Sequence, residues 1–134
     1  MALAIWLIVA AVPISWGLAG YIYDGGNVRE AQQMAYRTAE KAARLAADQL
    51  STASLRSDGD VAVDESAAIQ AGEEYLRAAG VDGSVDVENG GTVTVTAITS
   101  VDMKVLSGIG IGSIDVEESA SAESINANTE PEDV

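Results

Sequence analysis

The first 23 residues carry no charged side chain, and this run constrains the fold more than any other feature of the chain. The segment ALAIWLIVAAVPISWGLAGYIY has the length of a bilayer-spanning helix, which needs about 20 residues to cross a hydrocarbon core about 30 Å thick. Trp6 near one end and Tyr21 and Tyr23 near the other are typical interfacial anchors. Pro13 removes one backbone hydrogen bond, so we expect a kink or local loosening there.

A cleaved signal peptide is the competing interpretation of this run. Gly17-Leu18-Ala19 resembles a small-residue cleavage site, but the basic region that precedes the apolar part of a signal peptide is missing. Lys and Arg occur only after the run, which by the positive-inside tendency would place the C-terminal side in the cytoplasm. Acidic residues match most of these bases, and long domains are translocated largely regardless of charge, so orientation stays open from charge alone.

The net charge of −14 is distributed unevenly along the 134 residues. Residues 24–57 contain four acidic and five basic side chains, whereas residues 58–134 contain seventeen acidic side chains and only Arg77 and Lys104 as bases. The chain is therefore an apolar segment, a nearly neutral segment and an acidic segment in that order. An acidic surface repels phosphate, so we expect no nucleic-acid partner.

Composition also argues against catalysis and metal binding. The chain has no Cys and no His, which removes disulfides, thiolate and imidazole chemistry and the usual zinc sites. Lys41 and Lys104 are not in a recognisable nucleophile setting. The sequence therefore predicts no enzyme, no cofactor and no metal site. Calcium binding stays an open alternative for four acidic residues near the start of the third segment, Asp58, Asp60, Asp64 and Glu65.

The glycine-rich stretch at residues 107–112, SGIGIG, superficially resembles a nucleotide-binding loop. It lacks the G-x-G-x-x-G spacing, the strand-to-helix context and the P-loop lysine. We expect instead a flexible apolar connection, in which Ile109 and Ile111 form a possible contact loop for a neighbouring molecule.

Residues 28–55 contain strong helix formers and neither Pro nor Gly, which predicts a helix. Glu40 and Arg44 form a favourable i, i+4 pair. A stripe of small side chains follows one face, at Ala31, Ala35, Ala39, Ala42, Ala43, Ala46 and Leu50. Such a stripe lets two helix backbones approach closely, either a neighbouring helix or another element of the same small domain. The pattern alone leaves both open.

An acidic head is predicted from residue 58 to 125, after a helix break at residues 57–60. Asp64 is the expected N-cap of a second, amphipathic helix that ends at Gly80 and covers a sheet. The predicted class is α+β: a long N-terminal helix over residues 1–57 (apolar to 23, an alanine-rich stalk from 24), a short helix and a small three-stranded antiparallel sheet. Residues 126–134 are expected to form a flexible tail.

Alternating valines on both sides of Asn89-Gly90-Gly91 are the strongest strand signal in the chain. A two-residue turn would place Val87 opposite Thr92 and mix the apolar and polar faces. A three-residue loop pairs Val87 with Val93 and Val85 with Val95, so we predict that register, with a glycine in the left-handed conformation.

Beyond the hairpin, the apolar face is expected to run along Ala97, Val101, Met103 and Val105, with Ile98 on the other face. Apolar parity then shifts to Ile114, Val116, Ala120 and Ala122, which predicts a third strand entered through a loop or bulge. Asp115, Glu117, Glu118 and Glu123 are expected on its solvent side.

The first fifty residues resemble a known group of proteins. An apolar run ending in GLAGYIYDGG, followed by NVREAQQMAYRTAEKAARLAADQL with Ala46-Ala47-Asp48, is similar to the N-terminal region of the TadE/TadG proteins of tight-adherence pilus systems, which are relatives of type IV pilins. The order of short helix, valine hairpin and final Ala/Ser-rich strand also resembles their outer domains. Pro13 is comparable to the proline of pilin helices. Ile5 stands where a mature pilin has glutamate, which fits the TadG-like side of the group better.

The resemblance implies a pilin-like subunit that lies in the cytoplasmic membrane before assembly and then polymerises into an extracellular filament, with the pilus-assembly machinery and other copies of the chain as partners. Residues 2–50 would carry the self-association. The side chains expected to do so are Trp6, Pro13, Trp16, Gly17, Gly20, Ala31, Ala35, Ala39, Ala42 and Ala46. Gly25 and Gly26 are expected to act as a hinge, where a helix continuous through Asp24 bends or melts. The alternatives are a membrane-anchored assembly factor that does not polymerise and an acidic binding domain secreted after signal cleavage.

Overall fold

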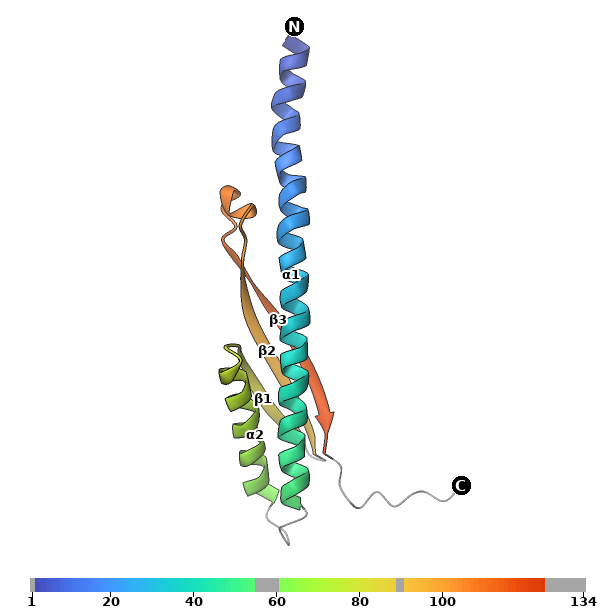
Figure 1. The fold of residues 1–134 in the computed structure, drawn as a ribbon, viewed down its shortest axis with the longest axis vertical. Helices are drawn as coiled ribbons and strands as arrows, with labels where there is room; N and C mark the ends of the chain where they lie inside the picture. The colour runs from blue at the N-terminus through green and yellow to red at the C-terminus, as the bar shows by residue number, and fades with distance from the viewer. Residues whose placement is uncertain (1, 55–60, 89–90, 125–134) are drawn as a thin grey trace, which may run out of the picture. The chain divides into compact units, whose positions relative to one another are not determined.

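The computed structural model describes residues 2–54, 61–88 and 91–124. It confirms the α+β class: helix α1 (Ala2–Ser54), helix α2 (Val61–Ala78), strands β1 (Asp82–Glu88) and β2 (Thr92–Asp102), the short 3-10 helix η1 (Leu106–Ile109) and strand β3 (Ser113–Glu123) (Figure 1). The three strands form one sheet in the order β1-β2-β3. The break expected at residues 57–60 and the tail at 126–134 lie outside the described residues.

Helix α1 runs without interruption through Pro13 and through Gly25-Gly26. The continuation through Asp24 is confirmed, whereas melting at the two glycines is wrong. Each glycine costs a helix about 1 kcal/mol relative to alanine, which lowers the stability of one turn but does not break a helix that is held on both sides. Asp24, immediately before the pair, is fixed by hydrogen bonds described below.

The chain divides into two compact units, one of residues 1–33 with 100–116 and the other of residues 34–99 with 117–134. The second unit holds the main core, in which both helices cover one face of the sheet. Its buried side chains are Ala35, Ala39, Ala42, Ala43, Ala46, Ala47, Leu50, Ala68, Leu76, Val81, Val85, Val93, Val95, Ala97 and Ala120. Nine of these fifteen are alanine, so helix and sheet backbones approach closely and each side chain buries little area.

The predicted hairpin register is confirmed. Val85 pairs with Val95 and Val87 with Val93, and Gly91 has φ 85° in the left-handed region. On the opposite face of the sheet, Ile98 is exposed, as expected, whereas Thr94 and Thr96 are half-buried. There, Thr94 and Thr96 hydrogen-bond to Ser121 and Ser119 at 2.9 and 3.0 Å, which joins β2 to β3.

Strand β3 follows the predicted shifted parity in part: Val116 and Ala120 are buried and Ala122 is half-buried, whereas Ile114 is exposed and its placement on the apolar face is wrong. The prediction that Glu118 lies on the solvent side is wrong, because it shares the parity of Val116 and Ala120 and is half-buried. Asp115, Glu117 and Glu123 are exposed, as predicted. The shift itself comes from the loop between β2 and β3, which is closed by a hydrogen bond from the Met103 N–H to the Gly112 carbonyl.

Helix α2 begins at Val61, so Asp64 is its fourth residue and the N-cap prediction is wrong. Aspartate is favoured both at the N-cap and in the first turn, where it complements the helix dipole, so the pattern does not distinguish the two positions. The C-terminal end is as expected. The Val81 N–H donates to the Leu76 carbonyl and the Gly80 N–H to the Arg77 carbonyl, with Gly80 at φ 69°. This is a Schellman motif, and Val81 and Leu76 supply its apolar contact.

Position 83 on β1 requires glycine because the β2 backbone and a side chain of α2 lie very close to it. A Cβ at this position would lie 2.0 Å from the Thr96 carbonyl oxygen and 3.1 Å from Leu76 Cδ1. We expect Gly83→Ala to destabilise the second unit by about 2–4 kcal/mol, because backbone atoms must move. Urea unfolding of the detergent-solubilised chain, followed by circular dichroism, measures the change. The neighbouring exposed residue provides the control, and Ser84→Ala is expected to change stability by less than about 0.5 kcal/mol. Equal stability of the two variants would contradict the assigned packing.

Candidate functional site

The N-terminal half of α1 carries the largest exposed apolar surface of the described chain. We call residues 3–22 the apolar segment. It is the uncharged part of Leu3–Ser51, which is the one helix stretch of the described residues that is long and apolar enough to cross a membrane. Only 6% of its most apolar window is buried. The exposed large side chains lie around the helix and not on one stripe: Leu3, Ile5, Trp6, Leu7, Ile8, Val9, Val12, Ile14, Trp16, Leu18, Tyr21 and Ile22.

The apolar segment ends at a buried carboxylate. Asp24 is 1% exposed. Its Oδ1 accepts from the Lys104 N–H at 3.1 Å, and its Oδ2 accepts from the Val105 N–H at 3.1 Å and the Leu106 N–H at 2.8 Å. Three successive backbone donors thus surround one carboxylate, which offsets the cost of removing its charge from water. We call this arrangement the Asp24 cluster.

The Asp24 cluster fastens the β2–β3 loop, residues 103–112, beside the apolar segment. One turn before Asp24, Gly20 is buried, and a Cβ there would lie 3.0 Å from Leu106 Cδ2 and 3.1 Å from Val105 Cγ1. The glycine lets the loop approach the helix. The stretch expected to be a flexible loop contains the 3-10 turn η1, closed by Gly110 at φ 94°.

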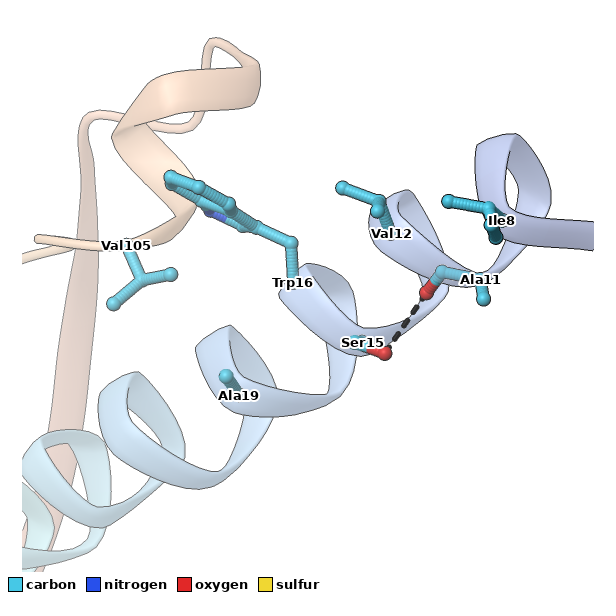
Figure 2. Close-up of a pocket in the computed structure, with 7 residues that line it drawn as sticks. All are labelled: Ile8, Ala11, Val12, Ser15, Trp16, Ala19 and Val105. Carbon is cyan, nitrogen blue, oxygen red and sulfur yellow. Dashed lines mark hydrogen bonds between the residues drawn. The ribbon is translucent and has the colours of Figure 1, made fainter. Parts of the chain in front are cut away.

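Two apolar grooves flank the place where the loop meets the helix. One has a volume of about 460 Å³ and is lined by Val105 together with helix residues from Ile8 to Ala19. Figure 2 shows Trp16 extending from the helix toward the loop, with Val105 on the facing side. The other, of about 440 Å³, lies between Trp16, Gly17 and Val12 of the helix and Gly108 and Ile109 of the loop. Both are lined mainly by apolar side chains.

The residues predicted to mediate self-association fall into two groups. Trp6, Pro13, Trp16 and Gly17 are exposed. Ala35, Ala39, Ala42 and Ala46 are fully buried in the core of their own chain, and Gly20 packs against the chain's own loop. The alternative of an alanine-rich helix that lies on its own domain therefore holds for these four alanines, which cannot touch a second copy in this fold. Ala31 is half-buried.

The remaining predicted sites are placed as follows. Ile109 and Ile111 of the possible contact loop are 68% and 40% exposed. The pair Glu40 and Arg44 forms the expected ion pair at 2.6 Å on the surface. Asp58 and Asp60 of the calcium alternative lie outside the described residues, and within the described part no group of three or more metal-ligating side chains gathers.

Sequence reasoning missed the Asp24 cluster. In the sequence, Asp24 is distinguished only as the first charged residue after the apolar run. Its three partners are backbone N–H groups about 80 positions later in the chain, so no side-chain pattern predicts them. A cue existed in hindsight: an aspartate directly beside a membrane-length run needs hydrogen-bond donors if it is to be buried.

No protein-family model, curated protein or solved structure matches this chain. Its functional assignment therefore depends on its own residues.

Removing the Asp24 carboxylate is expected to release the β2–β3 loop. Asp24→Ala leaves three backbone donors without an acceptor, and hydrogen bonds to charged groups contribute about 1.5–3 kcal/mol each. We expect amide hydrogen exchange of residues 104–106 to accelerate about a hundredfold in detergent micelles. Asp24→Asn keeps one acceptor oxygen and should have a smaller effect. The exposed residue Asp86 on β1 supplies the control, Asp86→Asn, whose loop exchange should equal that of the parent. Unchanged exchange in both Asp24 variants would refute the role assigned to the carboxylate.

Proposed function

We propose that the chain is a pilin-like structural subunit that inserts into the cytoplasmic membrane through the apolar segment and later polymerises through it into an extracellular filament. The observation that carries this proposal is the exposure of large apolar side chains around the whole circumference of residues 3–22. Water is a poor solvent for such a surface, so lipid or other copies of the segment must cover it.

The two parts of α1 differ in what covers them, and this difference supports the role of a filament subunit. Its 53 residues make a rod about 80 Å long at 1.5 Å per residue. The first part is apolar all round, and the second part is occupied by the chain's own acidic head. The apolar parts would pack together at a filament axis and the acidic heads would face water. The resemblance to TadE/TadG proteins supports the same assignment.

A second candidate function is a membrane-anchored pilus-assembly factor that does not polymerise. The specific observation in its favour is the burial of Ala35, Ala39, Ala42 and Ala46 in the intrachain core. The small-residue face of α1, which would let two helices approach most closely, is thereby used within the chain and is not free for contacts between copies. Such a protein would stay in the membrane fraction and be absent from fibres.

Membrane anchoring is tested by the intrinsic fluorescence of the chain. Both tryptophans, Trp6 and Trp16, lie in the apolar segment, so their emission reports on this segment alone. In phosphatidylcholine vesicles we expect blue-shifted emission that brominated lipids quench and aqueous iodide does not. The chain in detergent micelles without brominated lipid is the control. Efficient iodide quenching in vesicles, or an intact mass that lacks residues 1–19 in cell-derived material, would support the secreted acidic domain instead.

Polymerisation is tested by cysteine cross-linking, which the cysteine-free chain allows at single positions. We expect sheared cell-surface fibres to contain the chain and Ile8→Cys to form disulfide-linked dimers in those fibres on oxidation, because apolar segments of neighbouring copies would pack together. The matched control, Asp86→Cys on the exposed face of β1, should stay monomeric. Fibres without this chain by mass spectrometry would exclude the filament function, and recovery only from membranes, with no Ile8→Cys dimer, would identify the assembly factor.

A further inference from the structure

We propose that the β2–β3 loop is a second membrane contact, whose tip enters the bilayer beside the apolar segment and places Ile109 and Ile111 among lipid acyl chains. The proposal rests on the membrane anchoring in the proposed function but does not require polymerisation. The loop tip would contact the hydrocarbon of the leaflet at which α1 leaves the membrane.

The loop differs in composition from the acidic head to which it is joined. Between Lys104 and Asp115 ten consecutive residues, VLSGIGIGSI, carry no charge, although residues 58–134 hold seventeen acids. Two of the exposed large apolar side chains outside α1 lie in this loop, Ile109 and Ile111. Ile109 is 68% exposed, which in water leaves most of its apolar area unburied. A membrane would cover this surface.

The position of the loop along α1 matches the depth of one leaflet. The Asp24 cluster joins the base of the loop to the first charged residue after the apolar run, which sets the level of the membrane surface. From there the loop extends back along the helix, because Leu106 packs at Gly20, and Gly108 and Ile109 share a groove with Val12 and Gly17. Gly20, Gly17 and Val12 lie about 6, 10 and 18 Å from Asp24 at 1.5 Å per residue. Half of a hydrocarbon core is about 15 Å thick.

Unpaired backbone N–H and C=O groups are costly in hydrocarbon, so irregular backbone is tolerated there only where protein or a water-filled cavity covers it, and here α1 covers one side of the loop. Several backbone groups of the β2–β3 loop are also paired. Asp24 accepts from the N–H groups of residues 104–106. Within the loop the N–H groups of Gly108, Gly110 and Ile111 donate to the carbonyls of Val105, Ser107 and Leu106, and the Ser107 hydroxyl donates to the Lys104 carbonyl.

The charged residues that flank the loop set a limit on its depth. Asp102, Lys104 and Asp115 are exposed at its base, and moving any of them into the hydrocarbon would be costly. The base of the loop therefore stays at the membrane surface while its tip enters one leaflet, and the loop is not a second membrane span.

Site-directed spin labelling of the full chain in phosphatidylcholine vesicles at high lipid-to-protein ratio tests the proposal. Labels are placed singly through Ile109→Cys and Ile111→Cys on the loop, Val9→Cys on the apolar segment and Asp86→Cys on the head. Collision with oxygen, which concentrates in lipid, is compared with collision with a water-soluble nickel complex. We expect the oxygen-to-nickel ratio at both loop positions to approach that at Val9 and to exceed that at Asp86 about tenfold.

Each other pattern of accessibility overturns a defined part of the proposal. A nickel-accessible loop together with a lipid-like Val9 refutes the loop contact and leaves membrane anchoring intact. Nickel accessibility at Val9 itself refutes the anchoring and the loop contact together. Loop positions that neither reagent reaches are covered by protein, which refutes the lipid contact in favour of a second copy of the chain.

Discussion

Apolar surface on α1 has to be covered, and the chain covers only part of it. Residues 35–50 bury one alanine face against the sheet, while residues 3–22 expose apolar side chains on all sides. The small core follows from this arrangement. Because nine of its fifteen side chains are alanine, the head obtains its packing from close backbone approach at positions such as Gly72 and Gly83. A head held by such short contacts tolerates little added volume.

The Asp24 cluster lies where the sequence of α1 changes from apolar to polar. A carboxylate at this point would be costly in a bilayer and ordinary in water. Three backbone donors from the β2–β3 loop hydrogen-bond to it, and the loop is fastened to the helix by the same bonds. The Gly25-Gly26 pair therefore follows a fixed point, which explains why two residues that weaken a helix do not interrupt this one.

Much of the fold could be predicted from periodicity. The alternating valines determined the register of β1 and β2, since only one loop length buries all of them on one face, and the same parity placed Ile98 on the other face. Other features could not be predicted because their signals are ambiguous or not local. The alanine stripe suits a neighbouring helix and the chain's own sheet equally well. Asp64 suits an N-cap and a first turn equally well. The partners of Asp24 are main-chain groups whose position depends on the completed fold.

Among the described residues β1 and β3 form the two edges of the sheet, and both edges carry acidic side chains. The outward positions of β1 include Asp82, Asp86 and Glu88, and those of β3 include Asp115, Glu117 and Glu123. Two heads that joined strand to strand would bring several of these carboxylates close together, which is unfavourable. Growth of the sheet from molecule to molecule, the usual route to amyloid-like aggregation, is thus discouraged by the head itself. Heads placed close together would repel one another, so any order among them would come from contacts between their helices.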